Sequence, residues 1–252
     1  MANAVVIGPI VWIGAVVVVG ALVAFVVAAR RARRKGDPSP IVSVTLTISA
    51  FWAALSLLGA AITTLSILQP DFTVTVPVRE FWPQLPDGTQ IDGPTAEIVG
   101  GGFTSAELRA SGLSSSVRVT WAIGQALTAL IPGTIAALIA VACFQLLAGR
   151  AFAPVVSRAA AATAAVVAVG GVAAEVLNDI AGNLAASELL GLSGGRYKEV
   201  AGIEDVFAAW LPQPGFGIEF PLWPIAAGLA FTALAAIFRY GSRLQRDTEG
   251  LV

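Results

Sequence analysis

The sequence contains no histidine and only one cysteine, Cys143, which lies inside an apolar run. An internal disulfide, a thiol pair and an ordinary zinc site are therefore excluded. The absence of histidine also removes the serine–histidine pair that many hydrolases use. A "GxGD" motif, which would supply an aspartate for intramembrane proteolysis, is absent as well. We therefore expect no enzyme activity, no metal site and no cofactor.

Charged residues are also scarce, at 12% of the chain, which is about half the share found in soluble domains. Hydrophobic residues make up 56%, and several apolar runs reach 18 residues or more. Such runs predict helices that cross a lipid bilayer. The net charge of −1 provides no basic field for nucleic acid. The lipid bilayer is thus the first partner that the composition predicts.

Five apolar segments are predicted to span the membrane, at about residues 4–29, 41–68, 119–148, 157–186 and 221–238. The first segment ends in "RRARRKG" and has no positive charge before it, which is the reverse of a cleavable signal peptide. Two polar stretches, residues 69–117 and 187–219, separate the later segments. The fold class expected is an all-α integral membrane protein with a small mixed α/β extracytoplasmic cap. Residues 1–40 form an additional N-terminal span and loop, and residues 41–252 form a four-helix core.

Short patterns predict the content of the cap. "DFTVTVPV" (71–78) alternates and predicts a strand, and "LPDGTQI" contains an Asp-Gly turn signal. "TSAELRAS" (104–111) resembles a short helix with a capping box. "GFGIEF" (215–220) is interpreted as a second strand that pairs with 71–78 and joins the two polar stretches.

Two features concern the packing of the membrane helices. Small residues recur every three or four positions along 41–68: Thr45, Ser49, Ala53, Ser56, Ala60 and Thr63. This spacing predicts a face that packs closely against another helix. A hydroxyl-lined pore is the alternative interpretation. Pro132 lies near the middle of 119–148 and removes one backbone hydrogen bond, so a kink is expected there.

Sidedness follows from the basic residues. Ten of the fifteen basic residues lie in three segments, 30–40, 149–158 and 239–252, whereas only three of the sixteen acidic residues do. The positive-inside rule makes that side cytoplasmic, with the N-terminus outside and the C-terminus inside the cell membrane. The residues expected to set topology or to contact anionic headgroups are Arg30, Arg31, Arg33, Arg34, Lys35, Arg239, Arg243 and Arg246.

The segment "EVLNDIAGN" (175–183) is the candidate polar site. By helical spacing, Glu175, Asn178, Asp179 and Asn183 share one face. Eighteen residues from Ser157 raise Glu175 about 27 Å, close to the outer interface of the bilayer. Two interpretations are open: this face meets water or the cap, or its carboxylates bind a cation or pass a proton. The polar side chains expected nearby are Arg118, as a salt-bridge partner, and Gln125.

The end of the chain, "GFGIEFPLWPIAAGLAFTALAAIFRYGSRLQRDTEGLV", resembles the C-terminal signature of the bacterial membrane family catalogued as domain of unknown function 2975. The matching positions are Phe238, Gly241, Leu244 with Asp247, and Leu251-Val252. The resemblance covers about residues 41–252 and implies four spans with an external β-containing segment after the first. It implies no particular activity.

These observations lead to two hypotheses of function. The first is a non-enzymatic accessory, sensory or protective component of the membrane whose outer cap binds a partner or ligand. The alternative is a small ion or solute transporter component that uses the carboxylates of 175–183 and assembles into an oligomer. A protein partner and a homo-oligomer are both open, and the first span either packs on the core or mediates association.

Overall fold

The computed structural model of the chain describes residues 19–20, 23, 27, 30, 40–90, 92–93, 95–96 and 98–249. Most of the described residues are helical, and one small two-stranded sheet is present among them. The span expected at 4–29 lies outside the described residues except for isolated positions, and so do Arg31, Arg33, Arg34 and Lys35.

The chain divides into two compact units. The first, called the helical unit here, comprises Met1–Ser66, Ala122–Val176 and Phe220–Val252. The second, called the cap unit, comprises Ile67–Trp121 and Leu177–Glu219. The polar stretches 69–117 and 187–219 both lie in the cap unit, but this unit also includes the last part of the helix predicted at 157–186, from Leu177 onward.

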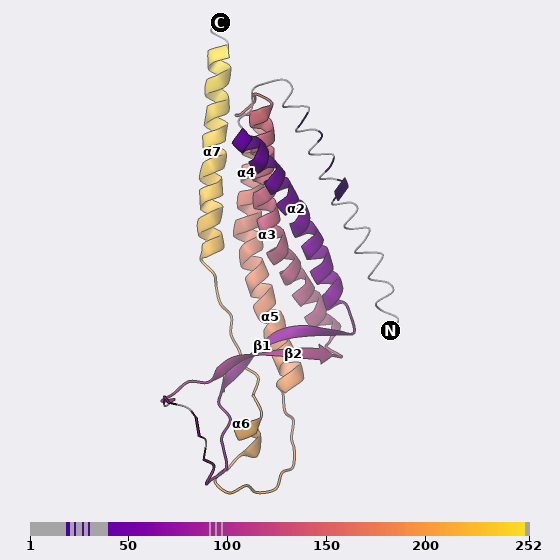
Figure 1. Cartoon of the computed structure of the whole chain (residues 1–252), viewed down its shortest axis with the longest axis vertical. Helices are drawn as coiled ribbons and strands as arrows, with labels where there is room; N and C mark the ends of the chain where they lie inside the picture. The colour runs from indigo at the N-terminus through magenta and orange to yellow at the C-terminus, as the bar shows by residue number, and fades with distance from the viewer. Residues whose placement is uncertain are drawn as a thin grey trace. The chain divides into compact units, whose positions relative to one another are not determined.

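Four helical segments among the described residues are long and apolar enough to cross a membrane. They are α2 (Pro40–Ile67), α3 (Ser115–Leu147), the continuous run of α4 (Pro154–Ala165), η1 (Val166–Gly170) and α5 (Gly171–Leu190), and α7 (Trp223–Glu249) (Figure 1). The four helices predicted between residues 41 and 252 are thus confirmed as helices.

The last helix is longer than predicted, because α7 continues from the expected end at 238 to Glu249. The apolar run stops near Phe238, but the helix does not need apolar residues to continue. Arginine, glutamine and leucine are good helix formers, and this segment contains several of them, which favours a helix in water. The hydropathy pattern therefore predicted the end of the apolar segment and not the end of the helix.

Small residues bring the membrane helices into close contact. A Cβ atom added to Gly133 of α3 would lie 2.8 Å from the Cβ atom of Ser56 on α2. The six small residues predicted as the packing face of α2 are all buried or half-buried, which confirms that face. Leu46 of α2 packs with Ala140 and Leu147 of α3 in a shared apolar cluster. These contacts favour the packing interpretation over a hydroxyl-lined pore.

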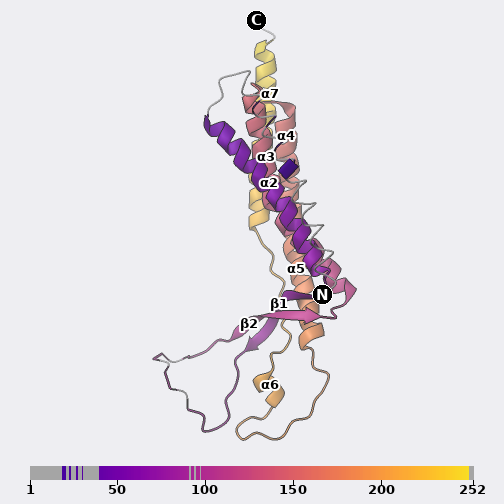
Figure 2. The same cartoon turned by 45° about the vertical axis from the view of Figure 1, so that its right-hand side comes forward.

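A wide π-helical turn, η1, interrupts what the sequence predicted as one regular helix. Helix α7 contacts both α4 and η1, and Figures 1 and 2 agree in placing α4 and α7 side by side. A Cβ atom on Gly228 of α7 would lie only 2.5 Å from the Cβ atom of Ala168 in η1. A π-turn bulges outward, so the absence of a side chain at position 228 gives it room. Helix α3, by contrast, continues through Pro132.

The sheet of the cap unit is a hairpin of β1 (Asp71–Phe81) and β2 (Phe103–Ser111) (Figure 2). The strands are antiparallel, with Thr75 opposite Glu107. The strand predicted at 71–78 is confirmed, and its alternate side chains are buried. The Asp-Gly turn is confirmed too, since Thr89 N donates to Pro86 O at 3.2 Å.

The helix predicted at 104–111 is wrong, because this segment is β2. Ala106, Leu108 and Ala110 alternate with polar residues and are its half-buried or buried positions. An eight-residue helix is marginal in water, whereas pairing with β1 satisfies the backbone groups of this segment that face β1. Tertiary pairing therefore overrides the capping-box signal.

The strand predicted at 215–220 is right in its partner and wrong in its extent. Arg79 N donates to Gln213 O and Gly215 N donates to Pro77 O, both at 3.0 Å, around a single bridge between Val78 and Pro214. Residues 215–220 form no strand. Proline at 212 and 214 has no N–H to donate, so a regular ladder does not form here.

Candidate functional site

The C-terminal part of α5 is bound to a distant segment of the cap unit. The side-chain amide of Asn183 donates from Nδ2 to Gly217 O at 2.9 Å and accepts from Gly217 N at its Oδ1 at 3.1 Å. The Asp179 carboxylate accepts a hydrogen bond from Glu219 N at 2.7 Å. Two of the predicted site residues therefore hold backbone groups of the protein itself.

Neighbouring positions of α5 complete this attachment. Gly182 lies beside β1, and an added Cβ atom would be in ordinary van der Waals contact with Pro77 Cδ, at 3.5 Å. The Glu188 carboxylate accepts a hydrogen bond from Ser114 N at 2.9 Å, just before α3 begins. The interpretation that this face of the helix meets the cap is thus confirmed for Asp179 and Asn183.

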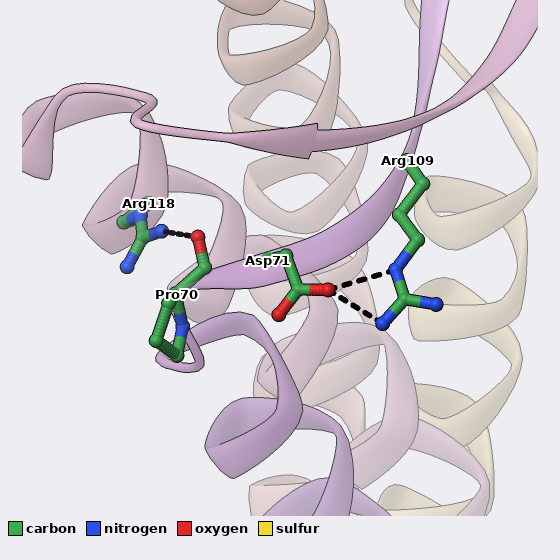
Figure 3. Close-up of polar contacts among 4 residues, drawn as sticks. All are labelled: Pro70, Asp71, Arg109 and Arg118. Atoms are coloured by element: carbon green, nitrogen blue, oxygen red, sulfur yellow. Dashed lines mark hydrogen bonds and ion pairs between the residues drawn. The ribbon is translucent and has the colours of Figure 1, made fainter. Parts of the chain in front are cut away.

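Arg118 does not pair with the acids of 175–183 among the described residues. Its Nη2 donates to Pro70 O at 2.6 Å (Figure 3). Its guanidinium carbon also lies 5.5 Å from the centroid of the Phe72 ring. The ion pair in this part of the cap unit joins Arg109 to Asp71, with Nε of the arginine 2.8 Å from Oδ2 (Figure 3). The salt bridge expected for Arg118 is replaced by a contact that holds the start of β1.

Glu175 has a different environment, in the helical unit. It lines a mostly apolar pocket of about 310 Å³ together with Thr128, Pro132, Gly171 and Trp223. Among the described residues its carboxylate has no hydrogen-bond or ion-pair partner. The described part of the chain also has no group of three or more acidic or cysteine side chains that could hold a metal ion.

The remaining predicted residues are placed as follows. Gln125 and Asn178 both have interaction partners within the chain. Arg30, Arg239 and Arg243 are exposed, and the side chain of Arg246 lies outside the described residues.

Sequence reasoning missed a set of exposed apolar residues in the cap unit, which we call the aromatic strip: Trp82, Leu85, Phe103, Trp210 and Leu211. The rings of Trp82 and Phe103 stack with centroids 5.3 Å apart and planes inclined by 13°, although the residues are 51% and 56% exposed. The sequence signal that could have predicted this strip is the presence of tryptophan, at positions 82 and 210, within the two polar stretches.

Hydrogen bonds join the segment that carries Trp82 and Leu85 to the segment that carries Trp210 and Leu211. Gln84 N donates to Ala209 O at 3.1 Å, and Trp210 Nε1 donates back to Gln84 O at 2.9 Å. Helix α6 (Val206–Trp210) presents Trp210, and Asp205 caps this helix by accepting from Phe207 N and Ala208 N. The strip therefore lies on ordered backbone.

Comparison with family models, with curated proteins and with solved structures finds no match for this chain. The resemblance of residues 41–252 to the family with domain of unknown function 2975 therefore stays a prediction.

Proposed function

We propose that this protein is a non-enzymatic component of a membrane assembly, and that its cap unit binds a partner protein through the aromatic strip. The observation that supports the proposal is the stacked and exposed pair of Trp82 and Phe103. Exposed apolar patches mark interaction sites, and tryptophan, tyrosine and phenylalanine are enriched there. Stacking and backbone hydrogen bonds fix these side chains, so their burial by a partner costs little conformational entropy.

The attachments around the strip suit this role. Asp179, Asn183 and Glu188 accept or donate hydrogen bonds inside the cap unit, and therefore act as structural groups. A cap held by these hydrogen bonds presents an ordered surface to a partner. The carboxylate of Asp179 already accepts a hydrogen bond from Glu219 N. An accessory or sensory role fits this arrangement better than catalysis.

Site-specific photocrosslinking in intact cells tests the proposal. A benzophenone amino acid at position 82 or 103 is expected to give one discrete crosslinked product, whereas the same group at the exposed Glu107 of β2 is expected to give none. The protein that is crosslinked to this chain should co-purify with it, and the double substitution Trp82→Ser with Phe103→Ser should abolish that co-purification. A product with twice the mass of the chain would identify a homo-oligomer. Equal crosslinking at 107 and at the strip would contradict the proposal.

A second candidate function, transport of a proton or small cation, is favoured by the pocket at Glu175. The pocket adjoins Pro132, and the carboxylate lacks a partner among the described residues. Unpaired acids within membrane helices are costly and are associated with ion pathways. Reconstituted protein should then carry protons or cations into liposomes, and Glu175→Gln should abolish the flux while Glu107→Gln leaves it intact. Full flux in Glu175→Gln would exclude this candidate.

A further inference from the structure

A groove of about 890 Å³ lies between α4 and α7 in the helical unit. Three arginines contribute to its lining, Arg158 from the start of α4 and Arg239 and Arg243 from α7. Arg158 is far from the other two in the sequence, and only the fold brings all three to one site.

The two walls of the groove are held together beside these arginines. The rings of Phe152, just before α4, and Phe238 of α7 have centroids 6.3 Å apart. Gly241 approaches Phe152 so closely that an added Cβ atom would overlap its ring. Because these contacts fix the spacing of α4 and α7, the groove is formed before any ligand arrives.

No carboxylate of the described residues neutralises the positive charge in the groove. None of those carboxylates contributes to its lining, and the ion pair found within the described residues, Arg109 with Asp71, belongs to the cap unit. Asp247, one turn beyond Arg243, is not within ion-pair distance of it. Three guanidinium groups that face one groove repel one another, so an anion between them would be stabilising.

The lining also indicates what kind of anion fits. Guanidinium groups bind phosphate through paired N–H donors, and the hydroxyl group of Tyr240 adds a further donor. Deeper along the two helices the lining consists of Ala161, Ala235, Ala236 and Thr232, and the hydroxyl of Thr232 donates to Gly228 O of its own helix, so this part is mostly apolar. A free phosphate would leave that apolar part uncovered, whereas a phospholipid would cover it with an acyl chain.

We propose that this groove binds an anionic phospholipid, with the headgroup phosphate between Arg158, Arg239 and Arg243 and an acyl chain along the alanines. The positive-inside rule predicts that these helix ends are cytoplasmic, and basic pockets between membrane helices on that side suit anionic headgroups. The site is separate from the cap unit and does not depend on the partner proposed for it.

Native mass spectrometry of the full-length protein in detergent tests the proposal. The protein is titrated with phosphatidylglycerol, and with phosphatidylcholine of the same acyl chains. We expect phosphatidylglycerol to be retained at concentrations at which phosphatidylcholine is lost. Arg239→Gln with Arg243→Gln should weaken its binding about tenfold or more. Arg196→Gln with Lys198→Gln, which removes the same charge from the cap unit, should leave it unchanged.

Two further measurements distinguish a bound phospholipid from a bound free anion. Ala161→Phe keeps every charge but fills the apolar part of the groove, and it should also weaken phosphatidylglycerol binding. Inorganic phosphate alone should not compete. Equal retention of the two lipids, unchanged binding in the arginine variant, or displacement of the lipid by inorganic phosphate would each overturn the proposal.

Discussion

Asn183 holds Gly217 through both ends of its side-chain amide, so one substitution removes two hydrogen bonds. We expect Asn183→Ala to lower the free energy of unfolding by about 1–3 kcal/mol, because the Gly217 N–H and carbonyl lose their partner. Asn183→Asp keeps an acceptor for Gly217 N but places a second acceptor against Gly217 O, so it should also be destabilising while it preserves the hydrogen bond of Gly217 N.

Urea unfolding in detergent measures this difference, and hydrogen exchange at Gly217 locates it. Exchange should become faster in Asn183→Ala and stay slow in Asn183→Asp. Glu107→Ala on the exposed face of β2 is the control and should change neither quantity. Unchanged exchange at Gly217 in Asn183→Ala would contradict the role assigned to this side chain.

The polar face of 175–183 was predictable, but its partners were not. Helical spacing alone places Asp179 and Asn183 together near the outer end of an apolar helix. The groups that they bind are backbone atoms of 217 and 219, in a segment with no distinctive side-chain pattern. A sequence carries no signal for such a contact, and this is why ion binding stays an open interpretation at the level of sequence.

The contact of α7 with η1 depends on the absence of a side chain at Gly228. We expect Gly228→Ala to lower the thermal stability, because the added methyl group overlaps Ala168 and overpacking costs about 1–3 kcal/mol. Gly59→Ala is a matched control, since no atom of the described residues lies within 4 Å of its added methyl group. That substitution should be neutral or stabilising by up to about 1 kcal/mol, because alanine favours helices.

Circular dichroism during heating compares these two variants in the same detergent. A melting temperature of Gly228→Ala equal to that of Gly59→Ala would show that the close approach does not limit the packing of α7.

Helices were easier to predict than the elements of the cap. Long apolar runs have few alternatives, so α2, α3 and α7 began within a few residues of their predicted positions. The segment 104–111 is short, and its alternation of Ala106, Leu108 and Ala110 competed with a capping signal; only the pairing with β1 decides between them. The π-turn η1 was not predictable, because an apolar run has the same hydropathy in either helix type.

The arrangement of charge along the chain predicts its orientation in the membrane. In a Cys143→Ala background, single cysteines can replace Thr89 in the cap unit and Gln245 in α7. A membrane-impermeant maleimide applied to intact cells should label Thr89→Cys and should reach Gln245→Cys only after permeabilisation. The reverse pattern would contradict the positive-inside assignment.

The same labelling tests the first span, which lies outside the described residues. Asn3→Cys should be labelled in intact cells if residues 4–29 cross the membrane, because an odd number of spans puts the two ends of the chain on opposite sides. Protection of Asn3→Cys together with labelling of Thr89→Cys would mean that this segment does not cross.

The division into a helical unit and a cap unit was the most predictable property of the chain. Apolar and polar stretches alternate in long blocks, and most of each unit comes from blocks of one kind, although residues 177–186 of an apolar segment belong to the cap unit. The composition of each block could not show which surfaces remain exposed. The aromatic strip and the groove between α4 and α7 were therefore identified only from the three-dimensional arrangement.

The π-turn η1 also sets the rotational register between α4 and α5. Its hydrogen bonds enclose one residue more than those of an α-turn, so removal of a single residue converts it into a regular helix. Val169, which is 71% exposed, is the residue that can be deleted with least loss of packing. Everything before it would keep its rotational position relative to Gly171 and Ala174, because the π-turn accommodates the additional residue within one turn. Arg158 would therefore stay on the wall of the groove, whereas deletion of one residue from the regular helix between Arg158 and η1 would turn it away by about 100°.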